Sequence, residues 1–201
     1  MQIVRSAETG DSHNIRQSPL NEHFLPLMAT TTAEKTAAEQ VHEKAEQALG
    51  FVPNLVKEIT QENPAVAEAY LTATGIVEEG GVLSGAEQQA VILAASSYND
   101  CHYCTKAHAV AGQQAGLDAE TVETINEGGL PSDDRLKSLV RATRRILGKR
   151  GWLSDADEAE FADLGLERPE LYEIVGLVGI KTISNYVNHI AGTEVDEPFQ
   201  Q

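Results

Sequence analysis

Residues 84–95 read Ser-Gly-Ala-Glu-Gln-Gln-Ala-Val-Ile-Leu-Ala-Ala, and this stretch decides the fold class. Ser84 and Glu87 have the spacing of a capping box, in which a hydroxyl and a carboxylate bind backbone N–H groups at a helix start. The apolar run 90–95 would fit a buried strand as well as a helix. The cap and the alanine content favour a helix that is buried on most sides.

The chain from Thr31 onward repeats this pattern of helix starts and stops. Thr31 and Glu34 form a capping box before a helix that Gly50 ends, and Pro169 lies near the start of a last helix that reaches about residue 191. Further helices are expected at 53–59, 63–79, from 84, 100–114, 118–126, 132–148 and from 154. Because no alternating β-branched runs occur, the sequence predicts an all-α fold of about eight helices.

The length of 201 residues, or 21.7 kDa, is that of one domain with a core large enough to need no disulfide or metal. Residues 1–29 are mostly polar and show no sustained periodicity, so we expect an extended arm there. Within it, the apolar residues 24–28 could dock on a folded body. Residues 30–201 are expected to form a single helical domain.

The charge balance excludes several partners. Asp and Glu number 31 against 15 Lys and Arg, which gives a formal net charge of −16. A nucleic-acid or anionic membrane surface needs clustered positive charge, so neither partner is expected. The acidity suits solubility and is also typical of a protein from a high-salt cytoplasm. Because neither a membrane span nor a signal peptide is evident, we expect a soluble cytoplasmic protein.

The chemically informative stretch contains the two cysteines of the chain, Cys101 and Cys104. With Asp100 as the expected helix cap, both thiols lie at the positive end of a helix, which lowers a thiol pKa. His108 follows Cys104 by four residues, so its imidazole lies on the same helical face and can accept or relay a thiol proton.

Three interpretations of this pair are open. In a redox dithiol, one thiolate attacks a substrate oxygen or disulfide and the other closes an intramolecular disulfide. As a metal site, the pair and His108 would supply only three ligands where structural zinc usually takes four. The third interpretation is two buried small side chains with an accidental spacing. Thr105 follows the second cysteine where a c-type haem site needs a histidine, so haem is excluded. The redox interpretation is favoured.

Four motifs occur in the order and at the separations of one family: Phe51-Val52-Pro53-Asn54-Leu55, Asn63-Pro64, Leu83-Ser84-x-x-Glu87 and Cys101-x-Tyr103-Cys104-x-x-x-His108. The chain resembles the alkylhydroperoxidase D-like (AhpD-like) branch of the carboxymuconolactone decarboxylase superfamily over about residues 50–190. The resemblance implies an all-helical fold, a trimer or hexamer, and thiol-dependent reduction of organic hydroperoxides without a further cofactor. It also implies that Cys104 attacks the peroxide, Cys101 resolves the product and His108 relays protons.

The chain departs from the family pattern at two positions. The family peroxidases carry a glutamate twelve residues before the first cysteine, where this chain has Gln89, an amide that is not a general base. Glu87 lies about 200° around the helix from that position, so it does not substitute. The family histidine before the second cysteine is replaced by Tyr103, and a histidine occurs one place earlier, at His102. A missing base predicts a slow peroxidase and a faster Gln89→Glu variant.

Other polar and aromatic residues have a structural interpretation beside a functional one. For Glu87, the interpretation as a capping carboxylate is favoured over a catalytic role. Gln89 either binds the proton relay or fills a buried polar position. His102 is expected to be exposed. Tyr103, like Gln89 and Glu87, is also a candidate for the proton relay or the pocket. Three further groups are expected to serve packing or ion pairing more often than the pocket. They are the aromatics Tyr98 and Tyr103, the last-helix residues Asn185, Asn188 and His189, and the basic residues Arg141, Arg144 and Arg145.

The leading hypothesis is an oxidoreductase that uses Cys104 and Cys101, assisted by His108, on a hydroperoxide or a protein disulfide. A thiol or protein electron donor would then regenerate the pair. Two alternatives remain: a lyase for a lactone acid, which needs a local cationic pocket, and a redox sensor in which disulfide closure changes subunit packing.

Overall fold

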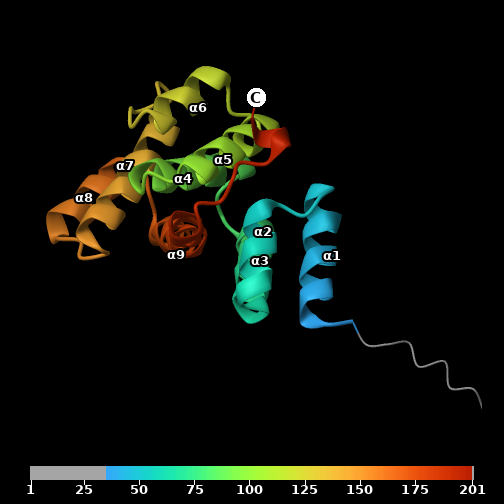
Figure 1. Ribbon diagram of the computed structural model, residues 1–201. Coiled ribbons are helices and arrows are strands. Elements are labelled where there is room, and N and C mark those ends of the chain that lie inside the picture. The colour runs from blue at the N-terminus through green and yellow to red at the C-terminus, as the bar shows by residue number, and fades with distance from the viewer. Residues whose placement is uncertain (1–34, 201) are drawn as a thin grey trace, which may run out of the picture. The chain divides into compact units, whose positions relative to one another are not determined.

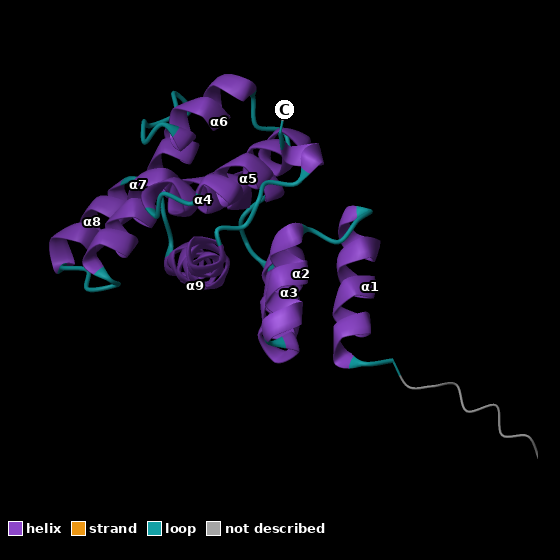
Figure 2. Ribbon diagram, viewed as in Figure 1, coloured by secondary structure: helices purple, strands orange, loops and turns teal. Residues whose placement is uncertain are grey.

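A computed structural model describes residues 35–200, which lie within one compact unit. This part of the chain contains nine α-helices and one short 3-10 helix, and no strand (Figure 2). The helices are α1 (Ala37–Leu49), α2 (Asn54–Glu62), α3 (Pro64–Gly80), α4 (Gly85–Tyr98), α5 (His102–Gln114), α6 (Ala119–Asn126), α7 (Asp134–Lys149), α8 (Asp155–Asp163) and α9 (Arg168–Ala191), followed by η1 (Glu197–Phe199). The prediction of an all-α fold of about eight helices is confirmed.

Helix α4 is the central element of the described residues. It contacts α5, α6, α7 and α9 (Figure 1), and its side chains from Ala90 to Ser96 are all buried. Ser84 and Glu87 form the predicted capping box at its start. A helix with neighbours on so many sides needs an apolar surface all round, which explains why the run 90–95 shows no helical periodicity.

Two of the three apolar clusters form around α4. One joins it to α7, α8 and α9 through side chains such as Val91, Leu139, Phe161 and Ile174. The other joins its opposite side to α6 and α7. Full burial of a large apolar side chain stabilises a fold by about 1.5–3 kcal/mol, so these clusters hold α4 and its neighbours as a rigid frame.

The third cluster positions the cysteines. Helices α1, α2 and α3 contact one another, and their apolar side chains pack against Cys101, Tyr103 and Cys104. Asn63 caps α3 through its side chain, directly before Pro64. The start of α5 is therefore enclosed by α1–α3 on one side and by α4 and α9 on another.

Two predicted helix starts need correction. The first described helix begins at Ala37, and its capping box is Thr36 with Glu39. The predicted pair Thr31 and Glu34 lies outside the described residues, as do the arm 1–29 and its apolar segment. At α5, the cap is Cys101 and not Asp100, which instead adopts a left-handed backbone (φ 54°) that turns the chain between α4 and α5.

None of the helices within residues 35–200 combines the length and the apolar character needed to cross a membrane.

Candidate active site

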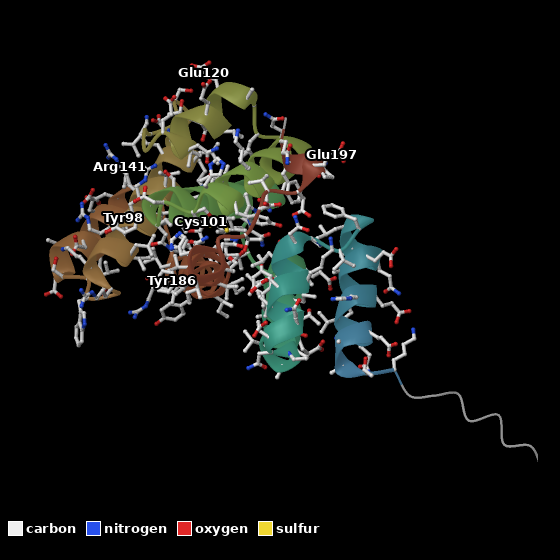
Figure 3. All side chains as sticks on the ribbon, viewed as in Figure 1. Tyr98, Cys101, Glu120, Arg141, Tyr186 and Glu197 are labelled. Carbon is white, nitrogen blue, oxygen red and sulfur yellow. The ribbon has the colours of Figure 1, made fainter. Side chains whose placement is uncertain are left out.

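The first turn of α5 brings the two sulfurs together. The Cys101 Sγ accepts a hydrogen bond from the Cys104 backbone N–H at 3.4 Å, the role that an oxygen plays in an ordinary helix cap. Both cysteines are free thiols, and each is only 1% exposed. In Figure 3, Cys101 lies in the interior, whereas Tyr186 and Glu197 lie on the outside.

Helix α9 supplies a polar contact to both thiols. The Asn188 Nδ2 donates to the Cys104 Sγ at 3.2 Å and lies 3.8 Å from the Cys101 Sγ. Asn185, one turn earlier, accepts a hydrogen bond from the Asn99 side chain at 2.9 Å. The sequence favoured a packing role for Asn188, but its amide contacts the two sulfurs directly. His189 is exposed and lies outside the site.

The surroundings make the two thiols unequal. The Cys101 thiol, the Lys181 ammonium and the amides of Asn185 and Asn188 lower the pKa of Cys104 to about 5, and burial opposes them. The hydrogen bond between the two cysteine side chains, together with burial, raises the pKa of Cys101. The lowered pKa of Cys104 favours its thiolate form, and the raised pKa of Cys101 favours its thiol form.

A short polar chain lies beside the sulfurs. The His108 Nδ1 is 3.0 Å from the Gln89 Oε1, and its Nε2 is 2.8 Å from the Lys181 Nζ. An ammonium group can only donate, so Nε2 accepts and Nδ1 carries the ring proton that is donated to Gln89. Burial, reinforced by the Lys181 charge, lowers the pKa of His108 well below its ordinary value. The imidazole is therefore neutral at physiological pH.

Lys181 is the main site residue that sequence reasoning missed. Its side chain is 2% exposed, although lysine is almost never buried without a partner. One signal was available, because Lys181 interrupts the apolar run Val175-Gly176-Leu177-Val178-Gly179-Ile180. The contact with His108 spans 73 positions and is invisible to local spacing.

A cavity of about 650 Å³ opens onto these groups. Its wall is mainly apolar, with side chains such as Phe51, Leu55, Tyr70, Leu71 and Phe199. Its polar lining includes Gln89, Cys104, His108, Lys181 and Glu78. Cys101 does not line the cavity and lies behind Cys104. A small apolar molecule in this cavity therefore meets Cys104 first.

Tyr103 serves the cavity wall rather than a proton relay. Its hydroxyl donates to the buried Asp196 at 2.6 Å, and Asp196 also accepts from the Asn54 backbone N–H. Burial and the neighbouring carboxylate raise the pKa of Tyr103, so the phenol stays protonated. The ring packs edge-on against Phe199 of the C-terminal segment. Tyr103 thus holds the C-terminal segment in place through its contacts with Asp196 and Phe199.

We expect Tyr103→Phe to lower the free energy of unfolding by about 1–3 kcal/mol, because a hydrogen bond to a buried carboxylate is lost. Urea unfolding would measure this loss, and Tyr98→Phe, at a half-exposed tyrosine, is the matched control. The alkylation rate of Cys104 should not change. Equal stability of the Tyr103→Phe and wild-type proteins would contradict the structural role.

The remaining candidates lie outside the cavity. Glu87 caps α4 and pairs with Arg135, as its capping interpretation predicted. His102 is exposed, as expected. Of the three basic residues predicted to pair with carboxylates, Arg145 does so with Asp157, whereas Arg144 donates to the backbone carbonyls of residues 125, 128 and 129.

Within residues 35–200, no three His, Cys, Asp or Glu side chains converge as a metal site would require. The cysteines and His108 are linked instead to amides and an ammonium group.

The described residues thus form an all-α fold in which a buried C-x-x-C pair at a helix start adjoins an apolar cavity. Residues 64–143 match the model of the Carboxymuconolactone decarboxylase family. This match supports the predicted resemblance to the carboxymuconolactone decarboxylase superfamily over these residues. Among curated proteins, no sequence matches the chain.

Solved structures share this fold. A peroxidase-related protein from Silicibacter sp. TM1040 is 21% identical, with a TM-score of 0.70 over 80% of this chain and 85% of that one. A peroxidase-related protein with an alkylhydroperoxidase AhpD core, from Ralstonia eutropha JMP134, is 18% identical, with a TM-score of 0.71 over 81% and 86%. The debrominase Bmp8 in complex with 2,3,4-tribromopyrrole is 17% identical, with a TM-score of 0.67 over 81% and 87%.

Proposed function

We propose that the chain is a thiol-dependent reductase of small organic hydroperoxides, with Cys104 as the attacking thiolate and Cys101 as the resolving thiol. The observation that carries this proposal is the order of the two sulfurs: Cys104 lines the apolar cavity, and Cys101 lies within hydrogen-bonding reach behind it. Because both thiols are buried, a small molecule suits the site better than a protein disulfide does.

The proposed reaction has two steps. The Cys104 thiolate attacks the terminal oxygen of R–O–O–H, so that the O–O bond breaks and an alkoxide leaves, which takes up a proton to give R–OH. The resulting Cys104 sulfenic acid then reacts with the Cys101 thiol to give a disulfide and water. Two thiols are oxidised for each hydroperoxide reduced, and an external thiol or protein donor must restore them.

This stoichiometry is the experimental test. In stopped flow, the reduced protein should consume one cumene hydroperoxide per chain, lose two thiols and form one intramolecular disulfide. Dithiothreitol should restore both thiols and allow a second cycle. Persistence of two free thiols in excess hydroperoxide, with the protein still folded by circular dichroism, would contradict the proposal.

A reductive dehalogenase is a second candidate, favoured by the apolar cavity beside a thiolate and by the fold shared with a protein described as a debrominase. Two thiols and a bromoarene would give the arene, bromide, a proton and a disulfide. The same assay with 2,3,4-tribromopyrrole distinguishes this candidate, because bromide release replaces hydroperoxide loss.

A lyase for a lactone acid is the third candidate, because Lys181 supplies the positive charge that an anionic substrate would need in an acidic protein. This chemistry uses no dithiol. Activity on a lactone acid that survives Cys104→Ser would favour it.

A further inference from the structure

Lys181 is a buried cation without a carboxylate partner. Its side chain is 2% exposed, and none of the ion pairs within residues 35–200 includes it. A buried ammonium without a partner is strongly disfavoured, so such a residue usually faces a negative charge that the protein supplies.

The groups around Lys181 are a hydrogen-bond acceptor and a thiol. The neutral His108 ring offers only a lone pair at 2.8 Å, which an ammonium fills as a donor. Lys181 and Cys104 both line the cavity, and the Lys181 charge lowers the pKa of both cysteines. The Asn188 amide lies closer to the Cys104 Sγ, at 3.2 Å, than to the Cys101 Sγ, at 3.8 Å, and the Asn185 amide also lowers the pKa of Cys104.

We propose that Lys181 is the counter-ion of a Cys104 thiolate, and that this ion pair takes the place of the acid–base relay that Gln89 cannot complete. His108 is then a positioning residue, which holds the ammonium with one nitrogen while Gln89 fixes the ring through the other. This inference deepens the proposed function, on which it rests for its role in turnover, by naming what ionises the nucleophile.

The other charged groups near the pair do not replace Lys181. Partial desolvation at the cavity rim raises the pKa of Glu78 on α3, and Lys181 opposes that rise. On α1, Lys44 is paired with Glu68, and after α9 the Asp196 carboxylate is bound to Tyr103 and to the backbone of α2. Helix α4 contributes the uncharged Gln89. Among the residues within 35–200 that line the cavity, Lys181 is therefore the one cation that forms no ion pair.

The test measures the alkylation of Cys104 by iodoacetamide between pH 4 and pH 9, in a Cys101→Ser background that leaves one thiol. Lys181→Met and Lys181→Gln should each slow alkylation at pH 6 by about tenfold or more and move the midpoint of the profile to higher pH, because the thiol loses its counter-ion. Lys181→Arg, which keeps the charge, should restore the rate at pH 6 to within about threefold of the lysine protein.

Two controls separate this role from a general effect of charge or stability. Lys106→Met removes an exposed cation from α5, two residues from Cys104, and should leave the profile unchanged. Glu78→Gln removes the nearest rim carboxylate and should not slow alkylation. Circular dichroism establishes that each variant is folded, and Lys181→Gln provides the test if the methionine variant does not fold.

A midpoint that is unchanged in a folded Lys181→Met or Lys181→Gln protein would overturn the inference. A loss in Glu78→Gln as large as that in Lys181→Met would also overturn it, because removal of a nearby negative charge should favour the thiolate and both losses would then reflect a disturbed cavity. Since alkylation needs no hydroperoxide, failure of the proposed peroxidase reaction would leave this result interpretable.

Discussion

Cys104→Ser should abolish hydroperoxide consumption, whereas Cys101→Ser should still consume one equivalent and then stop. Within residues 35–200, the first change removes the one sulfur that lines the cavity, and a serine hydroxyl is not ionised at neutral pH. The second leaves the thiolate, its Asn188 donor and its Lys181 neighbour in place. Consumption of a dye-detected hydroperoxide at pH 7, at one to ten equivalents, measures both.

The stability of each serine variant is the control, because both cysteines belong to the cluster that joins α5 to α1–α3. Urea unfolding should show similar midpoints for the two serine variants. Full turnover by Cys104→Ser would assign the attack to Cys101, as the helix dipole alone would favour.

Gln89→Glu should slow the alkylation of Cys104 at pH 5 by about tenfold and leave the rate at pH 8 nearly unchanged. The new carboxylate would accept the His108 Nδ1–H that now binds Gln89 and would add a negative charge on the far side of the ring. Because this charge raises the pKa of Cys104 above about 5, the thiolate is lost at a higher pH as the solution is acidified.

The same substitution distinguishes the ion-pair account from the relay that the sequence suggested. If the absent glutamate made the protein a slow peroxidase, Gln89→Glu would raise the hydroperoxide rate at pH 7. If Lys181 already ionises Cys104, the rate should not rise. Gln89→Leu is the matched control, since it removes the hydrogen bond without adding charge. A rise of tenfold or more in Gln89→Glu would show that a general base was missing.

The features that sequence reasoning predicted correctly are local ones. Ser84, Asp118 and Ser154 each cap the helix that follows, because a capping bond joins residues three apart and needs no tertiary partner. The placement of Cys104 and His108 beside one cavity follows from a spacing of one helical turn.

The errors at helix starts arose where neighbouring residues compete for one role. Thr36 and Glu39 repeat the capping-box spacing that Thr31 and Glu34 also have, and the sequence alone does not rank the two boxes. At α5, Asp100 is the better cap by residue type, but its left-handed backbone leaves Cys101 as the cap. That shift by one residue aims the Cys101 sulfur at the Cys104 N–H.

The residues of the site that sequence reasoning undervalued come from α9. Lys181 and Asn188 lie 73 and 84 positions from their partners on α5, and the packing of α9 against α4 and α5 brings them together. No local pattern reports such a contact. The lysine at the end of an apolar run in α9 was the one available signal for a site residue, because a buried cation needs a partner that stabilises its charge.

Trapping of the sulfenic acid tests directly whether Cys104 is the attacking thiolate. The Cys101→Ser protein would be mixed with one equivalent of cumene hydroperoxide and dimedone, and its peptides examined by mass spectrometry. The account predicts a dimedone adduct on Cys104 in nearly every chain, and none in a sample without hydroperoxide. An unmodified Cys104, together with a full adduct on Cys101 in the Cys104→Ser protein, would contradict it.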